Sequence, residues 1–178
     1  MSLKMFKVVG IFGVLIFCFL FHFIYSWFPN TLFSILFPVN ESIWEHMKLI
    51  MSSFLFYGII EYFLLKKNNI YFNNYITSVF LSGVLGIAVF LLIYLPLYDI
   101  FGENIFLNIS LLLIVICICE LISFNVLKSE KYSYFEYISL IGIMFVYILF
   151  AILTYFPIIN GLFYDNVHGK YGINLLAK

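Results

Sequence analysis

The sequence predicts an all-α integral membrane protein, a bundle of five transmembrane helices that forms a single transmembrane domain over residues 1–178. Of the 178 residues, 65% are hydrophobic and only 10% are charged, whereas soluble domains carry about 25% charged residues. The hydrophobic residues form five runs, each long enough to cross a bilayer as a helix. So few charges cannot cover a water-facing surface, and we therefore expect lipid to cover it.

The five spans are expected at about residues 5–28, 42–65, 75–98, 104–127 and 135–156, with a tail at 158–178 on the outer side. Pro29, Pro96 and Pro157 follow or close three of the runs, because proline interrupts helices. Thr31–Phe37 is apolar but too short to span, and predicts a re-entrant or interfacial segment. The first run begins like a signal peptide but is too long and lacks a cleavage site, so we expect it to remain as a helix.

Lysine residues set the expected orientation. They precede the first run and follow the second and fourth runs, at Lys4, Lys7, Lys66, Lys67, Lys128 and Lys131. Positive residues favour the cytoplasmic side, so we expect the N-terminus inside, the C-terminus outside, and a multi-pass protein of the plasma membrane. The net charge of zero and the lack of a basic patch argue against nucleic acid as a partner. The expected partners are membrane lipid and a small-molecule or lipid-like ligand.

The densest polar segment is Pro38–Lys48, at the start of the second span. It contains two carboxylates, Glu41 and Glu45, which are four residues apart and would stack on one face of a helix that included both. His46 follows directly. His22 lies about 9 Å below the outer end of the first span at 1.5 Å per residue, a depth at which a polar ring normally faces the bundle interior.

These residues predict an outward-facing metal site. Imidazoles and carboxylates from separate spans could hold zinc or a similar divalent cation and leave one position for a water nucleophile. We expect His22, His46, Glu41 and Glu45 as the ligands. Without a metal, His46, Glu45 and Glu41 could serve as general acid and base. The structural alternative is that Ser42 and Glu45 form a capping box and that His22 is a hydrogen-bonded core residue.

Two further regions carry polar residues. In the tail, Asp165 and the nearby glycines are typical of turns. The alternative is a lid over the bundle, in which Asp165 points inward as a gating or orienting acid and Phe163 is an anchor. Glu61 and Glu120 lie in the cytoplasmic halves of their spans and predict a second polar station for proton or cation coupling. Alternatively, Glu61 extends toward Lys66 or stays protonated.

Four segments resemble a known family. They are Leu20–Trp27, Leu36–Lys48, Ile60–Tyr62 and Leu162–Ile173, of which the specific part is Asn-Glu-Ser-Ile-Trp-Glu-His at 40–46. The resemblance is to an uncharacterised family of small bacterial (Clostridia-like) polytopic membrane proteins, a domain of unknown function, and it covers nearly the whole chain. It implies shared polar residues in the first, second and last elements, and no activity. Asn166 and His168 stand where that family usually has proline and threonine.

A fainter likeness covers only Asn40–His46. This segment is similar to the progestin and adiponectin receptor and ceramidase superfamily, whose members have seven spans, contain zinc and are hydrolase-like. The present chain has fewer spans and no C-terminal pair of histidines. The likeness therefore prompts the metal hypothesis and implies no common fold.

The first functional interpretation is a membrane-embedded hydrolase or transferase, metal-assisted or acid/base, that uses the His/Glu/Asp pocket. The alternative is a small-solute or ion transporter or binding protein, with Glu61 and Glu120 for coupling. A third interpretation is an accessory subunit without chemistry of its own.

Overall fold

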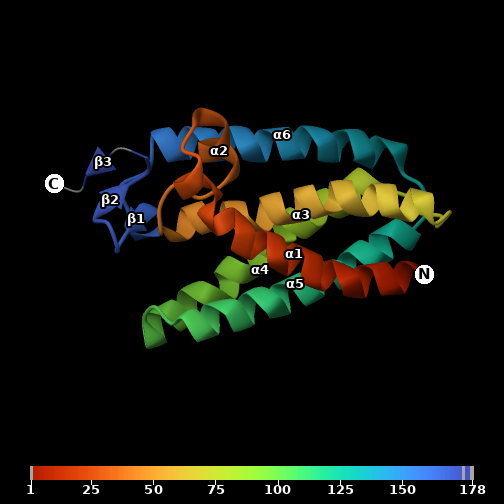
Figure 1. Ribbon diagram of the computed structural model, residues 1–178, viewed down its shortest axis with the longest axis horizontal. Helices are drawn as coiled ribbons and strands as arrows, with labels where there is room; N and C mark the ends of the chain where they lie inside the picture. Colours follow the sequence, from red (N-terminus) through yellow and green to blue (C-terminus); the bar gives the residue numbers. More distant parts are fainter. Residues whose placement is uncertain (1, 174, 177–178) are drawn as a thin grey trace.

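A computed structural model describes residues 2–173 and 175–176 of the chain. Figure 1 shows a bundle of long helices with a small folded tail at one end. The long helices are α1 (Leu3–Trp27), α3 (Ile43–Lys67), α4 (Tyr75–Phe101), α5 (Ile105–Lys128) and α6 (Ser133–Tyr155). All five are long and apolar enough to cross a membrane, which confirms the expected helical fold with five possible spans.

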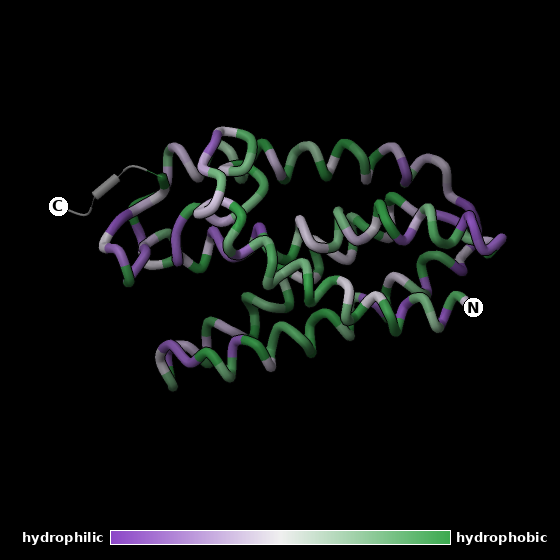
Figure 2. The backbone as a smooth tube through the Cα atoms, viewed as in Figure 1, coloured by the Kyte–Doolittle hydropathy of each residue, from purple (hydrophilic) through white to green (hydrophobic). Residues whose placement is uncertain are grey.

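The two ends of the bundle differ in character. At the lysine end, which we define as the end where α1, α4 and α6 begin, stand Lys4, Lys66, Lys67, Lys128 and Lys131. At the opposite end, here called the tail end, lie the short helix α2 and the C-terminal segment (Figure 1). Hydrophobic residues dominate the middle of the helices, and hydrophilic residues gather near the two ends (Figure 2).

Helix α3 is the centre of the bundle. In its apolar segment 61% of the residues are buried, against 17–28% in the other four long helices. Small residues let α4 approach it closely: a Cβ added at Gly86 would lie 2.9 Å from Cγ2 of Ile50. The main apolar core, which includes Val14, Met51 and Val115, surrounds this contact.

Helix α4 continues through Pro96 to Phe101, beyond the expected end of the third span at residue 98. A proline inside a helix frees one backbone carbonyl and is tolerated in membrane helices where local adjustment satisfies that group. Gly102 ends the helix instead, with a positive φ of 67° that glycine adopts without steric cost.

The expected short segment after α1 is a helix of six residues, α2 (Thr31–Leu36). Asn30 caps it, with its side-chain oxygen accepting a hydrogen bond from the Phe33 amide at 2.9 Å. The helix packs against α6 (Figure 1), where the hydroxyls of Ser34 and Tyr155 lie 2.9 Å apart. The chain thus crosses to α6 before it enters α3.

The tail is folded against the bundle. It consists of a 3-10 turn (Gly161–Phe163) and the strands β1 (Tyr164–Asp165), β2 (Lys170–Tyr171) and β3 (Leu175–Leu176), which form an antiparallel sheet in that order. Phe163 is buried, and its ring centroid lies 5.0 Å from that of Trp44 at the start of α3. The last part of the expected tail, residues 174 and 177–178, lies outside the described residues.

Gly172 fixes the tail to α6 and to the loop before α3. Its carbonyl accepts a hydrogen bond from the Asn40 side chain at 2.8 Å, and the next amide, of Ile173, donates to the carbonyl of Thr154 at 3.1 Å. Gly172 has φ of 53°, and an added Cβ would collide with the Thr154 carbonyl oxygen and lie 3.0 Å from Pro157. Only glycine fits this backbone without strain.

Substitution of Gly172 tests whether the tail is docked. Gly172→Ala should release the tail, because the new methyl group meets backbone and would hold a left-handed conformation at a cost of about 1–3 kcal/mol. Limited proteolysis in detergent should cleave the variant between residues 158 and 173 several times faster than the wild type. Gly161→Ala is the matched control, because Gly161 has no atom within 4 Å of the added Cβ. Equal cleavage rates for the two variants would contradict the docked tail.

Candidate metal centre

His46 is held in one orientation by the start of α3. Ser42 is the N-cap of this helix, and its hydroxyl accepts a hydrogen bond from the Glu45 amide at 3.3 Å. The carbonyl oxygen of Ser42 lies 2.9 Å from Nδ1 of His46. A carbonyl only accepts hydrogen bonds, so Nδ1 must carry the proton and Nε2 presents a lone pair. Histidine ligands of metals are usually fixed by this kind of contact.

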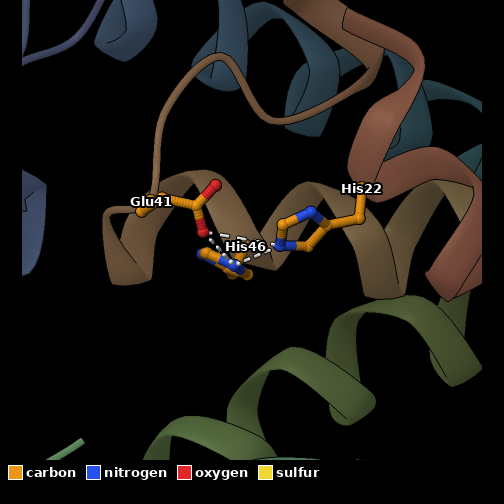
Figure 3. Close-up of side chains that lie close together, drawn as sticks. All are labelled: His22, Glu41 and His46. Atoms are coloured by element: carbon orange, nitrogen blue, oxygen red, sulfur yellow. Dashed lines mark hydrogen bonds and ion pairs between the residues drawn. The ribbon is translucent and has the colours of Figure 1, made fainter. Parts of the chain in front are cut away.

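Three of the four predicted ligands come together at the tail end. Nε2 of His22, on α1, lies 3.1 Å from Nε2 of His46. Oε2 of Glu41, in the loop before α3, lies 3.5 Å from each of these two nitrogen atoms. Figure 3 shows the carboxylate and the two imidazoles pointing toward a common centre. Their side chains are 29–35% exposed, so the cluster is open to an entering ligand.

The size of this triangle fits zinc. Zinc binds histidine nitrogen and carboxylate oxygen at about 2.0–2.2 Å in a tetrahedral arrangement, so two of its ligand atoms lie about 3.3–3.6 Å apart. The two separations of 3.5 Å fall in this range, and the third, at 3.1 Å, is slightly shorter. Two imidazoles and one carboxylate, with a fourth position left open, are a ligand set found in catalytic zinc sites. The residues present therefore fit a divalent metal.

A cavity of about 420 Å³ adjoins the triangle. Side chains from α1, α3, α4 and α5 line it. Its polar lining includes His22, Glu41, His46, Glu103 and Asn108, and most of the remaining lining is apolar, such as Phe19, Ile50, Phe90 and Leu112. The cavity thus has both polar and apolar walls, as a site for an amphipathic molecule requires.

Glu41 is ionised more readily than an ordinary glutamate. The hydrogen bond from His22 is the main reason why its pKa lies below the usual value, and the nearby ring of His46 adds to the effect. Partial burial acts in the opposite direction and is outweighed. A carboxylate that stays ionised is the form that binds a cation.

Asp165 is not one of the three residues of the triangle, and it contacts the backbone of Glu41 instead. Burial alone would raise its pKa, but hydrogen bonds from His168 and from the backbone amides of Glu41 and Val167 outweigh burial and leave the pKa below its ordinary value. Oδ1 accepts from the Val167 amide at 2.9 Å, and Oδ2 lies 2.9 Å from Nδ1 of His168. The ionised carboxylate stabilises the fold above the ordinary aspartate pKa, and this contribution is lost on acidification. Through the Glu41 backbone, Asp165 positions a residue of the triangle.

The structure places Glu45 outside the triangle, in a buried ion pair with Lys48. Its Oε2 accepts from Nζ of Lys48 at 2.6 Å and from the amide of Val39 at 3.0 Å. Its Oε1 accepts from the hydroxyl of Thr154, on α6, at 2.8 Å. Lys48 also donates to the Ser34 carbonyl at 2.7 Å. Both carboxylate oxygens are occupied, and the pair of Glu45 and Lys48 ties α3 to α2 and α6.

Glu61 and Glu120 meet at the lysine end, together with a residue that the sequence interpretation did not include. Nζ of Lys7, on α1, lies 2.8 Å from Oε2 of Glu61 and 3.3 Å from Oε2 of Glu120. Lys7 lies within the first apolar run, where it counts as a topological signal. Its place two residues inside that run, about half a helical turn, does not by itself distinguish a buried lysine from one that reaches the membrane surface.

The fold and the site together define the class of this protein. It is a helical protein with five helices able to span a membrane and with a cluster of two histidines and one glutamate at one end. The chain belongs to the family of unknown function DUF6512, which it matches over residues 1–173. This confirms the expected membership of an uncharacterised family. No curated protein and no solved structure matches the chain significantly.

The buried pair of Glu45 and Lys48 can be tested by a double-mutant cycle. Glu45→Gln should lower the free energy of unfolding by about 3–5 kcal/mol, because it leaves the Lys48 ammonium buried without its counter-charge. The double variant Glu45→Gln/Lys48→Met should recover part of this loss, because no unpaired charge remains. Denaturant titration in detergent measures both, with the exposed-site variant Glu130→Gln as control. A single variant as stable as the control would contradict the buried pair.

Proposed function

We propose that this protein is a membrane-embedded, metal-assisted hydrolase or transferase that acts on an amphipathic substrate. His22, His46 and Glu41 would hold zinc or a similar divalent cation. The single observation that carries the proposal is the triangle of two Nε2 atoms and one Oε2 atom with edges of 3.1–3.5 Å. The fixed tautomer of His46 supports it, since its lone pair points into the triangle.

The chemistry follows from the ligand set. Bound zinc would lower the pKa of a water molecule and polarise a substrate carbonyl or phosphoryl group. The Ser42 carbonyl holds His46, and Asp165 holds the backbone of Glu41, so both ligands are oriented in advance. Glu103 is the other carboxylate on the cavity wall. While Glu41 binds the metal, Glu103 would act as the base that accepts a proton.

The cavity determines the substrate class in this proposal. Apolar side chains on α1, α3, α4 and α5 would bind an alkyl or acyl chain, and the polar wall would bind the reacting group. Because the lysine end would face the cytoplasm, the triangle would lie at the outer membrane surface. A substrate there would enter from the outer leaflet or from the external solution.

The packing between the two polar centres favours an enzyme over the alternative, a transporter. On α1, Val14 lies between Lys7 and His22, and it is completely buried. On α3, Met51 and Phe54 lie between His46 and Glu61, and both are buried in the same apolar core. A transport path would need polar or open space at this level.

Metal content tests the proposed ligands. Wild-type protein incubated with zinc and dialysed should retain about one zinc ion per chain. His22→Ala, His46→Ala and Glu41→Gln should each weaken retention by at least about tenfold, because each removes one ligand. The matched control is Glu130→Gln, which removes an exposed carboxylate at the lysine end, away from the triangle. Mass spectrometry of the purified variants gives the stoichiometry. Absence of retained zinc in the wild type, or full retention in the three ligand variants, would refute the site.

Hydrolysis of long-chain esters tests the proposed activity. Zinc-loaded protein in lipid nanodiscs should hydrolyse 4-methylumbelliferyl esters, and faster as the acyl chain lengthens, because the cavity wall is mostly apolar. Leu112→Trp should lower the rate on the long-chain ester about tenfold, equivalent to about 1.4 kcal/mol of barrier. Leu113→Trp is the control, because Leu113 is exposed on the same helix and does not line the cavity. Equal rates for the two variants, or no zinc-dependent hydrolysis, would count against the proposal.

A further inference from the structure

A second polar centre lies inside the bundle near the lysine end. It consists of Lys7 on α1, Glu61 on α3 and Glu120 on α5, which are only 6%, 2% and 3% exposed. The ammonium of Lys7 bridges the two carboxylates, at 2.8 Å from Glu61 and 3.3 Å from Glu120. Tyr75, on α4, donates from its hydroxyl to Oε2 of Glu61 at 3.0 Å or to the Gly58 carbonyl at 2.7 Å.

This centre has one negative charge in excess when both carboxyl groups are ionised. Two carboxylates face one ammonium, and the other nearby charges are engaged or exposed. Glu136 on α6 accepts hydrogen bonds from the amides of Ile76 and Thr77 at the start of α4. The remaining lysines at this end, Lys4, Lys66, Lys67, Lys128 and Lys131, are either exposed or lie in the loops. A buried uncompensated charge costs several kcal/mol.

The hydrogen bonding of the centre is also incomplete. Oε1 of Glu61, Oε2 of Glu120 and the hydroxyl of Tyr57 are buried and have no hydrogen-bond partner within the described part of the chain. The Lys7 ammonium contacts Oε2 of Glu120 without hydrogen-bond geometry. Buried polar atoms without partners are rare and mark a missing donor, water or ion.

A proton satisfies both requirements. Added to one carboxyl group, it makes the centre neutral and converts an acceptor oxygen into a donor. A metal cation fits less well, because the Lys7 ammonium already lies between the carboxylates and would repel it. Space is also short: a Cβ at Gly10 would lie 2.7 Å from Oε1 of Glu120 and 3.1 Å from Cε1 of Tyr57.

We propose that the centre formed by Lys7, Glu61 and Glu120 binds one exchangeable proton, which is shared between the two carboxyl groups. The proton comes from water at the lysine end, since Glu61 lies about 9 Å from the end of α3 at Lys67 at 1.5 Å per residue. This inference does not depend on the metal centre, which lies at the opposite end of the bundle. It gives the protein a proton-binding site inside the half of the bundle at the lysine end.

Infrared spectroscopy of the reconstituted protein at about pH 6 counts the protonated carboxyl groups. The wild type should show one carboxylic acid C=O band from a buried group, and the band should shift in D₂O because the proton exchanges. Glu61→Gln and Glu120→Gln should each abolish the band, because the remaining carboxylate then pairs with Lys7. Lys7→Met should double it, because two carboxyl groups then lack a counter-charge. Glu130→Gln, at an exposed position, is the control and should leave the band unchanged.

Several outcomes would overturn the proposal. They are an absent band in the wild type, a band that survives both glutamine variants, or a band that does not shift in D₂O. Loss of the band on addition of NaCl would show that the centre prefers a sodium ion to a proton. If Lys7→Met does not fold, the two glutamine variants and the wild-type spectrum decide the question by themselves.

Discussion

Helix α3 places charged residues inside the bundle, and the structure depends on the groups that pair with them. Glu45, Lys48 and Glu61 are all at most 2% exposed, in a helix surrounded by apolar side chains. A buried charge is tolerated only when it is paired and hydrogen-bonded. The surrounding elements supply these partners. Helices α2 and α6 bring the Ser34 carbonyl and the Thr154 hydroxyl to Lys48 and Glu45, while α1 brings Lys7 to Glu61.

This requirement explains the position of the candidate metal centre. The contacts of Glu45 and Lys48 fix both the rotation and the start of α3. Consecutive helix residues point about 100° apart, so when Glu45 faces α6, His46 faces α1 and meets His22. The loop before α3 then places Glu41 above the two imidazoles, and the folded tail fixes it through Asp165. The centre is thus held by buried contacts on the far side of the same helix turn.

Much of this arrangement could be predicted from the sequence, and the rest had specific physical obstacles. The five apolar runs predicted the five long helices, because hydropathy alone decides which segments can cross a bilayer. His22, Glu41 and His46 could be grouped because all three belong to one end of the bundle. Glu45 was grouped with them on the assumption that a helix includes both Glu41 and Glu45. The helix begins at Ile43, so Glu41 is not stacked on Glu45, and the helical spacing rule does not apply.

Other features were beyond a single sequence for a different reason. The partners of Glu45 include Thr154, which is 109 residues away in the chain, and no local pattern connects them. Lys7 was counted as a charge that orients the first span, and only the packing of α1 against α3 and α5 shows that it is buried. The tail docks through Phe163 on Trp44 and through Gly172 on Asn40, which is 132 residues away in the chain, and no local pattern connects these partners.

The two polar centres share α3, but the electrostatic interaction between them is weak. His46 and Glu61 are separated by 15 residues, which is about 22 Å along the helix. Two unit charges at this distance interact by about 0.8 kcal/mol at an effective dielectric constant of about 20. This is small beside the several kcal/mol that a local buried partner contributes. The side chains of Met51 and Phe54, which are at most 4% exposed, lie between the two centres in the apolar core. Any stronger coupling would therefore have to pass through a shift of α3 itself, and such a shift would disrupt the Glu45–Lys48 pair that fixes the helix.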